Sequence, residues 1–145
     1  MKIEKWNHCI YQIRYHMVMV VKYRKNLLES EQSIEALQQV LQEIAQEYSY
    51  IIDEIGVDKN HIHLFIWAWW MESPSKIMWT IKSLSAKRML KLEDVKKELW
   101  GWSFWSSWWY IGTVGDGTNE ETVRKYIKNQ WINEKYYDKL RFCSL

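Results

Sequence analysis

Proline, cysteine and long apolar runs are scarce in this chain, and each shortage excludes a class of protein. The only proline is Pro74, and no linker, internal repeat or low-complexity tract divides the sequence. The two cysteines, Cys9 and Cys143, lie near opposite ends without CxxC spacing, so we expect free thiols rather than a zinc site or a disulfide framework. No stretch approaches the roughly 18 apolar residues of a membrane span, and charges begin at Lys2, so we expect a cytoplasmic protein.

Net charge is also small, at +2 for 145 residues. Attraction of the whole molecule to nucleic acid would therefore be weak, and any such binding must depend on local basic patches. Hydrophobic residues make up 48% and charged residues 26%, which is typical of a folded globular protein, and the length suits one domain over residues 1–145. Any function must reside in that single domain.

Tryptophan is the residue in excess. The chain has eleven, and most of them lie between residues 67 and 109. Additional core, a subunit interface and a platform for stacked bases are all open explanations. We favour the interface, because tryptophan is common where proteins meet.

Hydrophobic spacing predicts strands and helices in a β-α-β-β-α-β order. The predicted strands are residues 9–21, 50–57, 61–68 and 104–114. Apolar residues at spacings of three and four predict a helix that begins near Ser30, and Ser73-Pro74 is a start signal for a second helix. Thr118, with Glu121 three residues on, is a capping box for a last helix. We therefore predict an α+β, ferredoxin-like split fold, with helices on one face of the sheet and a C-terminal helix in addition.

Two histidines two residues apart are the first candidates for chemistry. On a strand, His61 and His63 point to one face, while Ile62, Leu64 and Ile66 point to the other. The apolar residues suit the helix-covered face, which leaves both histidines on the open face with room for a divalent metal. Strand histidines that merely have hydrogen-bond partners are the common alternative for such a pair.

A second pair lies on the expected last helix. Tyr126 and Gln130 are four residues apart, so they share a face while Val123 and Ile127 pack inward. Because packing explains most helix tyrosines and solvation most helix glutamines, this pair indicates little when it is taken alone.

Together, these pairs and several shorter motifs resemble the TnpA-type transposases of the two-hundred-series insertion sequences and their REP-associated relatives, in the HUH endonuclease superfamily. The motifs are Tyr15-His16, Lys22-Tyr23-Arg24, residues 58–64, residues 81–85, Leu99-Trp100, Val114-Gly115 and residues 126–130. They occur in the family's order over about residues 10–131. The chain departs from the family at residues 67–71, where aromatic residues stand in place of a segment that usually contains proline.

The resemblance implies a role for each pair. His61, His63 and Gln130 would hold Mg²⁺ or Mn²⁺, and Tyr126 would be the nucleophile. The metal would act as a Lewis acid, and the product would be a 5′-phosphotyrosine link that a 3′-hydroxyl can reverse without a nucleotide cofactor. The substrate would be single-stranded DNA with hairpins at the element ends. The protein would be a homodimer in which the tyrosine helix of each subunit completes the site of the other.

Basic residues are the candidates for DNA binding, together with aromatic side chains that stack on bases. The basic candidates are Lys22, Arg24, Lys25, Lys82, Lys87 and Arg88. Each is equally well explained as a solvated surface charge. Two other functions stay open: a nucleic-acid-binding module without chemistry, and a nickase of the replication-initiator type, although such nickases normally carry further domains.

Overall fold

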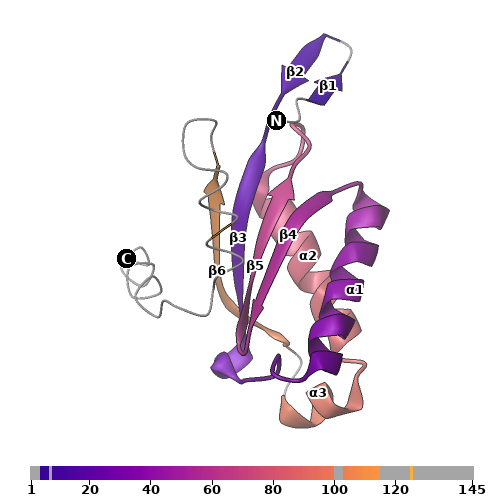
Figure 1. The fold of residues 1–145 in the computed structure, drawn as a ribbon, viewed down its shortest axis with the longest axis vertical. Helices are drawn as coiled ribbons and strands as arrows, with labels where there is room; N and C mark the ends of the chain where they lie inside the picture. The colour runs from indigo at the N-terminus through magenta and orange to yellow at the C-terminus, as the bar shows by residue number, and fades with distance from the viewer. Residues whose placement is uncertain (1–3, 7, 100–102, 115–124, 126–145) are drawn as a thin grey trace.

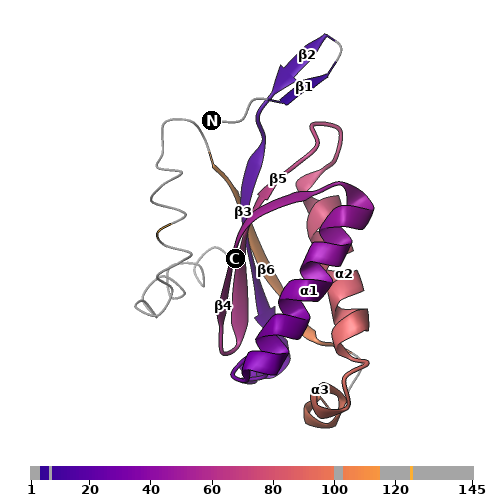
Figure 2. The same cartoon turned by 45° about the vertical axis from the view of Figure 1, so that its right-hand side comes forward.

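The computed structural model describes residues 4–6, 8–99, 103–114 and 125. Its main layer is an antiparallel sheet with the strand order β4-β5-β3-β6. The strands are β3 (Arg14–Val21), β4 (Ile51–Asp58), β5 (His61–Trp67) and β6 (Trp105–Thr113). Helices α1 (Glu31–Tyr48) and α2 (Pro74–Met89) lie against the same face of this sheet (Figure 1, Figure 2). This order and layering confirm the predicted ferredoxin-like split fold. The helix predicted after Thr118 lies outside the described residues.

The predicted first strand, residues 9–21, is in fact two strands. β2 (Cys9–Tyr11) leaves the main sheet and pairs with β1 (Glu4–Trp6) in a separate antiparallel hairpin. All of β3 is buried, whereas Ile10 in the middle of β2 is exposed. The break falls at Gln12 and Ile13, where no glycine or proline interrupts the sequence, so its pattern carries no sign of the change of partner.

Besides β1, two other short elements were not predicted. The turn η1 (Lys22–Arg24) is a single 3₁₀ turn at the end of β3, and α3 (Glu93–Glu98) is a six-residue helix in which only Val95 is buried. Neither is long enough to show a hydrophobic period. Within the described residues, none of the helices has the length and apolarity to span a membrane.

Both long helices begin where the sequence predicted, and each has a serine cap. Ser30 Oγ accepts a hydrogen bond from Ser33 N at 3.1 Å, and Ser73 Oγ accepts one from Lys76 N at 3.2 Å, with Pro74 as the first helical residue. The apolar stripe of α1 then packs on the sheet through Leu37, Leu41, Ile44 and Ala45. The caps thus set where the two helices begin, and the apolar stripe sets which side of α1 packs on the sheet.

The tryptophans divide between core and surface. Trp67 and Trp105 are buried, whereas Trp79 on α2 is 73% exposed and Trp109 on β6 is 39% exposed. The Arg14 guanidinium lies 4.7 Å from the centre of the Trp67 ring, a cation–π contact. Additional core therefore explains Trp67 and Trp105, and the exposed tryptophans keep the interface and stacking explanations open.

A buried serine holds the first tryptophan of β6. Ser85 on α2 is fully buried, and its Oγ accepts a hydrogen bond from Trp105 Nε1 at 2.8 Å. Ser85→Ala would leave this indole N–H without its acceptor, so we expect a loss of about 1–3 kcal/mol in the free energy of unfolding, measured by urea denaturation. The control is Ser83→Ala, because Ser83 is only partly buried and bonds only within its own helix. Equal stabilities for the two variants would contradict this account.

Candidate functional site

The two histidines of β5 lie on the sheet face that α1 and α2 leave uncovered. Ile62, Leu64 and Ile66 belong to the core beneath the helices, so His61 and His63 point the opposite way, as the alternation predicted. Their ring centres are 5.3 Å apart, with an interplanar angle of 60°. The strand thus presents two imidazoles side by side.

The pair is more enclosed than the sequence indicated. His61 is 8% exposed and His63 is 1% exposed, whereas we expected an open face. Burial lowers the pKa of His63 to about 2, with His16 and His61 as further causes. Burial also lowers the pKa of His61, against the opposing effect of Asp58 and with a smaller contribution from Arg24. Since a lowered pKa favours the uncharged ring, both imidazoles are neutral at physiological pH, which is the form that binds metal.

A third histidine joins this pair from the neighbouring strand. His16 on β3 is buried, and its Nε2 lies 2.8 Å from Nδ1 of His63. Burial lowers the pKa of His16 to about 4, so this ring is also neutral. The ring of Tyr110 on β6 meets His16 edge-on, with centroids 5.9 Å apart. In the sequence, His16 stands out only as part of the Tyr15-His16 motif, without a predicted role of its own.

The turn between β4 and β5 holds the other histidine. Nδ1 of His61 lies 2.7 Å from Oδ1 of Asn60, and Nε2 of His61 lies 3.7 Å from Oδ2 of Asp58. Asp58 Oδ1 accepts a hydrogen bond from Lys59 N, and Asn60 O accepts one from Val21 N at the end of β3. The turn is therefore tied both to itself and to the central strand, which sets the position of His61.

These features fit imidazole ligation of a divalent cation, because two neutral rings stand on one strand face with a nearby amide and carboxylate. Within the residues that the structure describes, no group of three His, Cys, Asp or Glu side chains is arranged to hold a metal ion. A complete site would therefore need another donor. Tyr126 and Gln130, the predicted nucleophile and third ligand, lie outside the described residues.

One of the predicted basic residues, Arg24, stands beside this site. Lys22 and Arg24 are in η1, directly after β3, and Arg24 is close enough to His61 to lower its pKa. Tyr23 and Arg24 both have left-handed backbone conformations, with φ values of 58° and 51°, which cost roughly 1–2 kcal/mol each for residues other than glycine. Backbone hydrogen bonds from Val21 N to Asn60 O and from Lys22 N to Phe104 O, both 2.8 Å, hold this turn in place. Tyr23 is 76% exposed.

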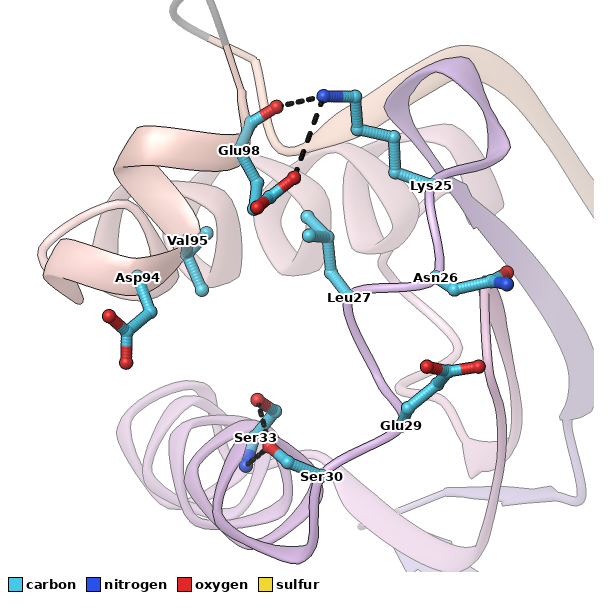
Figure 3. A pocket seen from close by; sticks show the side chains of 9 residues that line it. All are labelled: Lys25, Asn26, Leu27, Glu29, Ser30, Ser33, Asp94, Val95 and Glu98. Atoms are coloured by element: carbon cyan, nitrogen blue, oxygen red, sulfur yellow. Dashed lines mark hydrogen bonds and ion pairs between the residues drawn. The ribbon is translucent and has the colours of Figure 1, made fainter.

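Lys25 lies at a hollow on the helix-covered side of the molecule. Its Nζ donates to the backbone oxygen of Glu98 and lies 3.9 Å from the Glu98 carboxylate. The hollow, of about 530 Å³, is between the start of α1 and α3 and is also lined by Glu29 and Asp94 (Figure 3). Because its carboxylates outnumber its one lysine, this surface is unfavourable for a phosphate backbone.

The three remaining basic candidates are on α2. Lys82 Nζ donates to Ser106 O on β6 at 2.8 Å, and burial, with a contribution from Lys22, lowers its pKa. Arg88 lies 3.2 Å from the Glu43 carboxylate and 2.7 Å from the Glu47 carboxylate, so it ties α2 to α1. Lys87 is exposed. Of the six, Arg24 is the residue that the structure places beside the histidines, and Lys22 shares its turn.

The sequence matches a known protein family over most of its length. The family model described as "Transposase IS200 like" matches residues 9–130, a range that includes the histidine pair, Tyr126 and Gln130. The chain is 29% identical, over 135 residues, to the ISDra2 transposase TnpA of Deinococcus radiodurans, covering 92% of this chain and 95% of that protein.

Two solved structures share the fold. The crystal structure of a candidate transposase from Deinococcus radiodurans R1 matches with a TM-score of 0.72 and 25% identity, over 88% of this chain and 97% of that one. A REP-associated tyrosine transposase, solved bound to a REP hairpin, matches with a TM-score of 0.59 and 14% identity, over 91% of this chain and 76% of that one. The second likeness concerns the fold alone.

Proposed function

Because the chain belongs to the IS200-like transposase family, we propose that it cuts and rejoins single-stranded DNA beside hairpins at the ends of its element. Tyr126 is the nucleophile, and His61, His63 and Gln130 hold a Mg²⁺ or Mn²⁺ ion. The observation that supports this most is the pair of buried, neutral histidines on the uncovered face of β5. When bound, the metal supplies Lewis-acid polarisation of the scissile phosphate.

The remaining chemistry is carried by the chain itself. The Tyr126 oxygen attacks phosphorus and loses its proton, an O–P bond forms to the phosphate at the 5′ end of the downstream strand, and the bond from phosphorus to the 3′-oxygen of the upstream strand breaks. That 3′-oxygen takes up a proton and leaves as a hydroxyl. The phosphotyrosine bond conserves the energy of the broken phosphodiester bond. Attack by another 3′-hydroxyl therefore releases Tyr126 and rejoins DNA without a nucleotide cofactor.

A doubly labelled substrate tests this function. A pool of single-stranded hairpin oligonucleotides with randomised flanks, labelled at either end, is incubated with protein and Mn²⁺ and run on a denaturing gel. The 3′ label should migrate with the protein, and the 5′ label should appear on a shorter strand that a polymerase can extend. Hairpin binding without either product would instead indicate a nucleic-acid-binding module without chemistry.

Lys22 and Arg24 are expected to contribute backbone contacts close to the cut. Lys22→Gln and Arg24→Gln should each weaken hairpin binding and lower the slope of log affinity against log salt by about 0.7, the value for one phosphate contact on a single strand. The measurement is fluorescence anisotropy over a salt series. The matched control is Lys76→Gln, in the first turn of α2 at the opposite end of β5, where Lys76 pairs with Glu72 at 2.9 Å. An equal change of slope in all three variants would contradict this placement.

The homodimer is part of the same proposal: the helix with Tyr126 and Gln130 from one subunit completes the histidine site of the other. Support comes from β6, which is an edge strand of the sheet within the described residues and carries the half-exposed Trp109. Pairing such an edge with a second copy would remove an aggregation hazard. A symmetric pair also supplies two sites for two DNA ends.

Mixing two inactive variants tests that exchange. His61→Ala and Tyr126→Phe proteins, refolded or exchanged together, should recover roughly one quarter of the wild-type sites, because half of the randomly assorted dimers are mixed and each has one intact site. Adduct formation is the readout. If each site is built within one subunit, the mixture stays inactive, and a monomer in sedimentation at the assay concentration would remove the proposal.

A further inference from the structure

The contact between His16 and His63 has the geometry of a hydrogen bond between two ring edges. The nitrogen atoms are 2.8 Å apart, and the ring planes differ by 20°. The ring centres are 5.0 Å apart, which is close to the nitrogen–nitrogen distance plus the radii of the two rings. The rings therefore meet end to end in nearly one plane, with Nε2 of His16 facing Nδ1 of His63.

Such a bond allows only two arrangements of protons. A neutral imidazole has one N–H and one lone pair, so one ring must donate and the other must accept. If His63 donates from Nδ1, its lone pair is at Nε2. If His16 donates from Nε2, then Nδ1 of His63 carries the lone pair and Nε2 carries the proton, which blocks Nε2 as a metal ligand.

His61 indicates which arrangement the site uses. Its Nδ1 lies 2.7 Å from Oδ1 of Asn60, and an amide oxygen can only accept, so the proton of His61 is at Nδ1 and its lone pair is at Nε2. A His63 that donates to His16 has the same tautomer. Both histidines then direct Nε2 lone pairs from one strand face, and each has its Nδ1 proton held by an acceptor, the usual arrangement for metal-binding histidines.

We propose that His16 is a positioning residue: it accepts the Nδ1 proton of His63 and so keeps the Nε2 lone pair of His63 available to a divalent cation. The use of that lone pair rests on the proposed function, whereas the tautomer does not. The fold suits this task, because β3 is the central strand and the pairing of Val18 with His63 places His16 one diagonal step away. His16 is 7% exposed and His63 is 1% exposed, so water competes little for the Nδ1 proton.

Nitrogen NMR reads the tautomer directly, without metal or DNA. In protein labelled with ¹⁵N-histidine near neutral pH, two-bond correlations distinguish a protonated Nδ1 from a protonated Nε2. We expect His63 to be protonated at Nδ1 in the wild type. His16→Leu should move the proton largely to Nε2, and His16→Gln should keep it at Nδ1, because a glutamine oxygen can accept where Nε2 of His16 did. A wild-type His63 protonated at Nε2 overturns the inference whatever the variants do.

Mn²⁺ binding, followed by loss of the free-ion electron paramagnetic resonance signal, supplies the second readout. His16→Leu should weaken Mn²⁺ binding about 10–100-fold, as loss of a hydrogen-bond partner of a ligand histidine does, and His16→Gln should restore most of it. The control is His8→Leu, because His8 is exposed. His61→Ala separates the two proposals: if it leaves Mn²⁺ binding unchanged, the metal site fails while the tautomer result stands. Equal Mn²⁺ affinity in wild type and His16→Leu overturns the positioning role.

Discussion

Tyr126→Phe protein is expected to form no covalent adduct with hairpin DNA, while its affinity for that DNA stays nearly unchanged. The substitution removes one oxygen atom, which is the atom that forms the bond to phosphorus. A phenol is suited to this step because its pKa is near 10, so the phenolate both attacks and leaves readily. Denaturing gels measure the adduct, and fluorescence anisotropy measures binding.

Two nearby tyrosines supply matched controls for this substitution. Tyr136→Phe and Tyr137→Phe remove the same atom from the same stretch of sequence. Both should form the adduct at the wild-type rate. An adduct that persists in Tyr126→Phe and disappears in either control would assign the nucleophile elsewhere.

Replacing either histidine of β5 should have an effect of similar size. His61→Ala or His63→Ala removes a metal ligand, and the loss of several kcal/mol of transition-state stabilisation corresponds to a decrease of about 10³-fold in the cleavage rate. Hairpin binding should change little, because phosphate contacts elsewhere supply most of the affinity. Single-turnover cleavage with saturating protein measures the rate without a contribution from binding.

His8→Ala is the control for these variants, since His8 lies before β2 and is exposed. It should cut DNA at the wild-type rate. Excess EDTA should slow DNA cleavage by the wild-type protein as much as either substitution does. Cleavage that continues in EDTA would contradict the metal role of both histidines.

Local signals in the sequence were sufficient for most of the fold. The alternation around His61 and His63 predicted both the strand and the face that each side chain takes. The apolar spacing after Ser30 and the cap at Ser73 predicted where the helices begin. Such signals depend on neighbours along the chain, which is why they can be read without a structure. The split between β2 and β3 was missed because it reflects a change of strand partner rather than of local pattern.

The site itself was only partly predictable. The parity of β3 places His16 on the face opposite Met17 and Met19, but its contact with His63 depends on which strands pair and in which register. The near-complete burial of His63 is likewise a property of the packed molecule. The ion pairs of Arg88 also depend on tertiary packing. In the sequence Arg88 was a candidate for DNA binding, and in the structure it pairs with two carboxylates of α1.

Mapping the covalent bond tests the central proposal most directly. The adduct of wild-type protein with hairpin DNA is digested with nuclease and protease, and the modified peptide is sequenced by mass spectrometry. We expect a nucleotide joined through its 5′-phosphate to the oxygen of Tyr126, formed with Mn²⁺ and absent in EDTA. A nucleotide attached to any other residue would contradict the proposed mechanism. So would cleavage of the DNA that leaves no nucleotide attached to the protein.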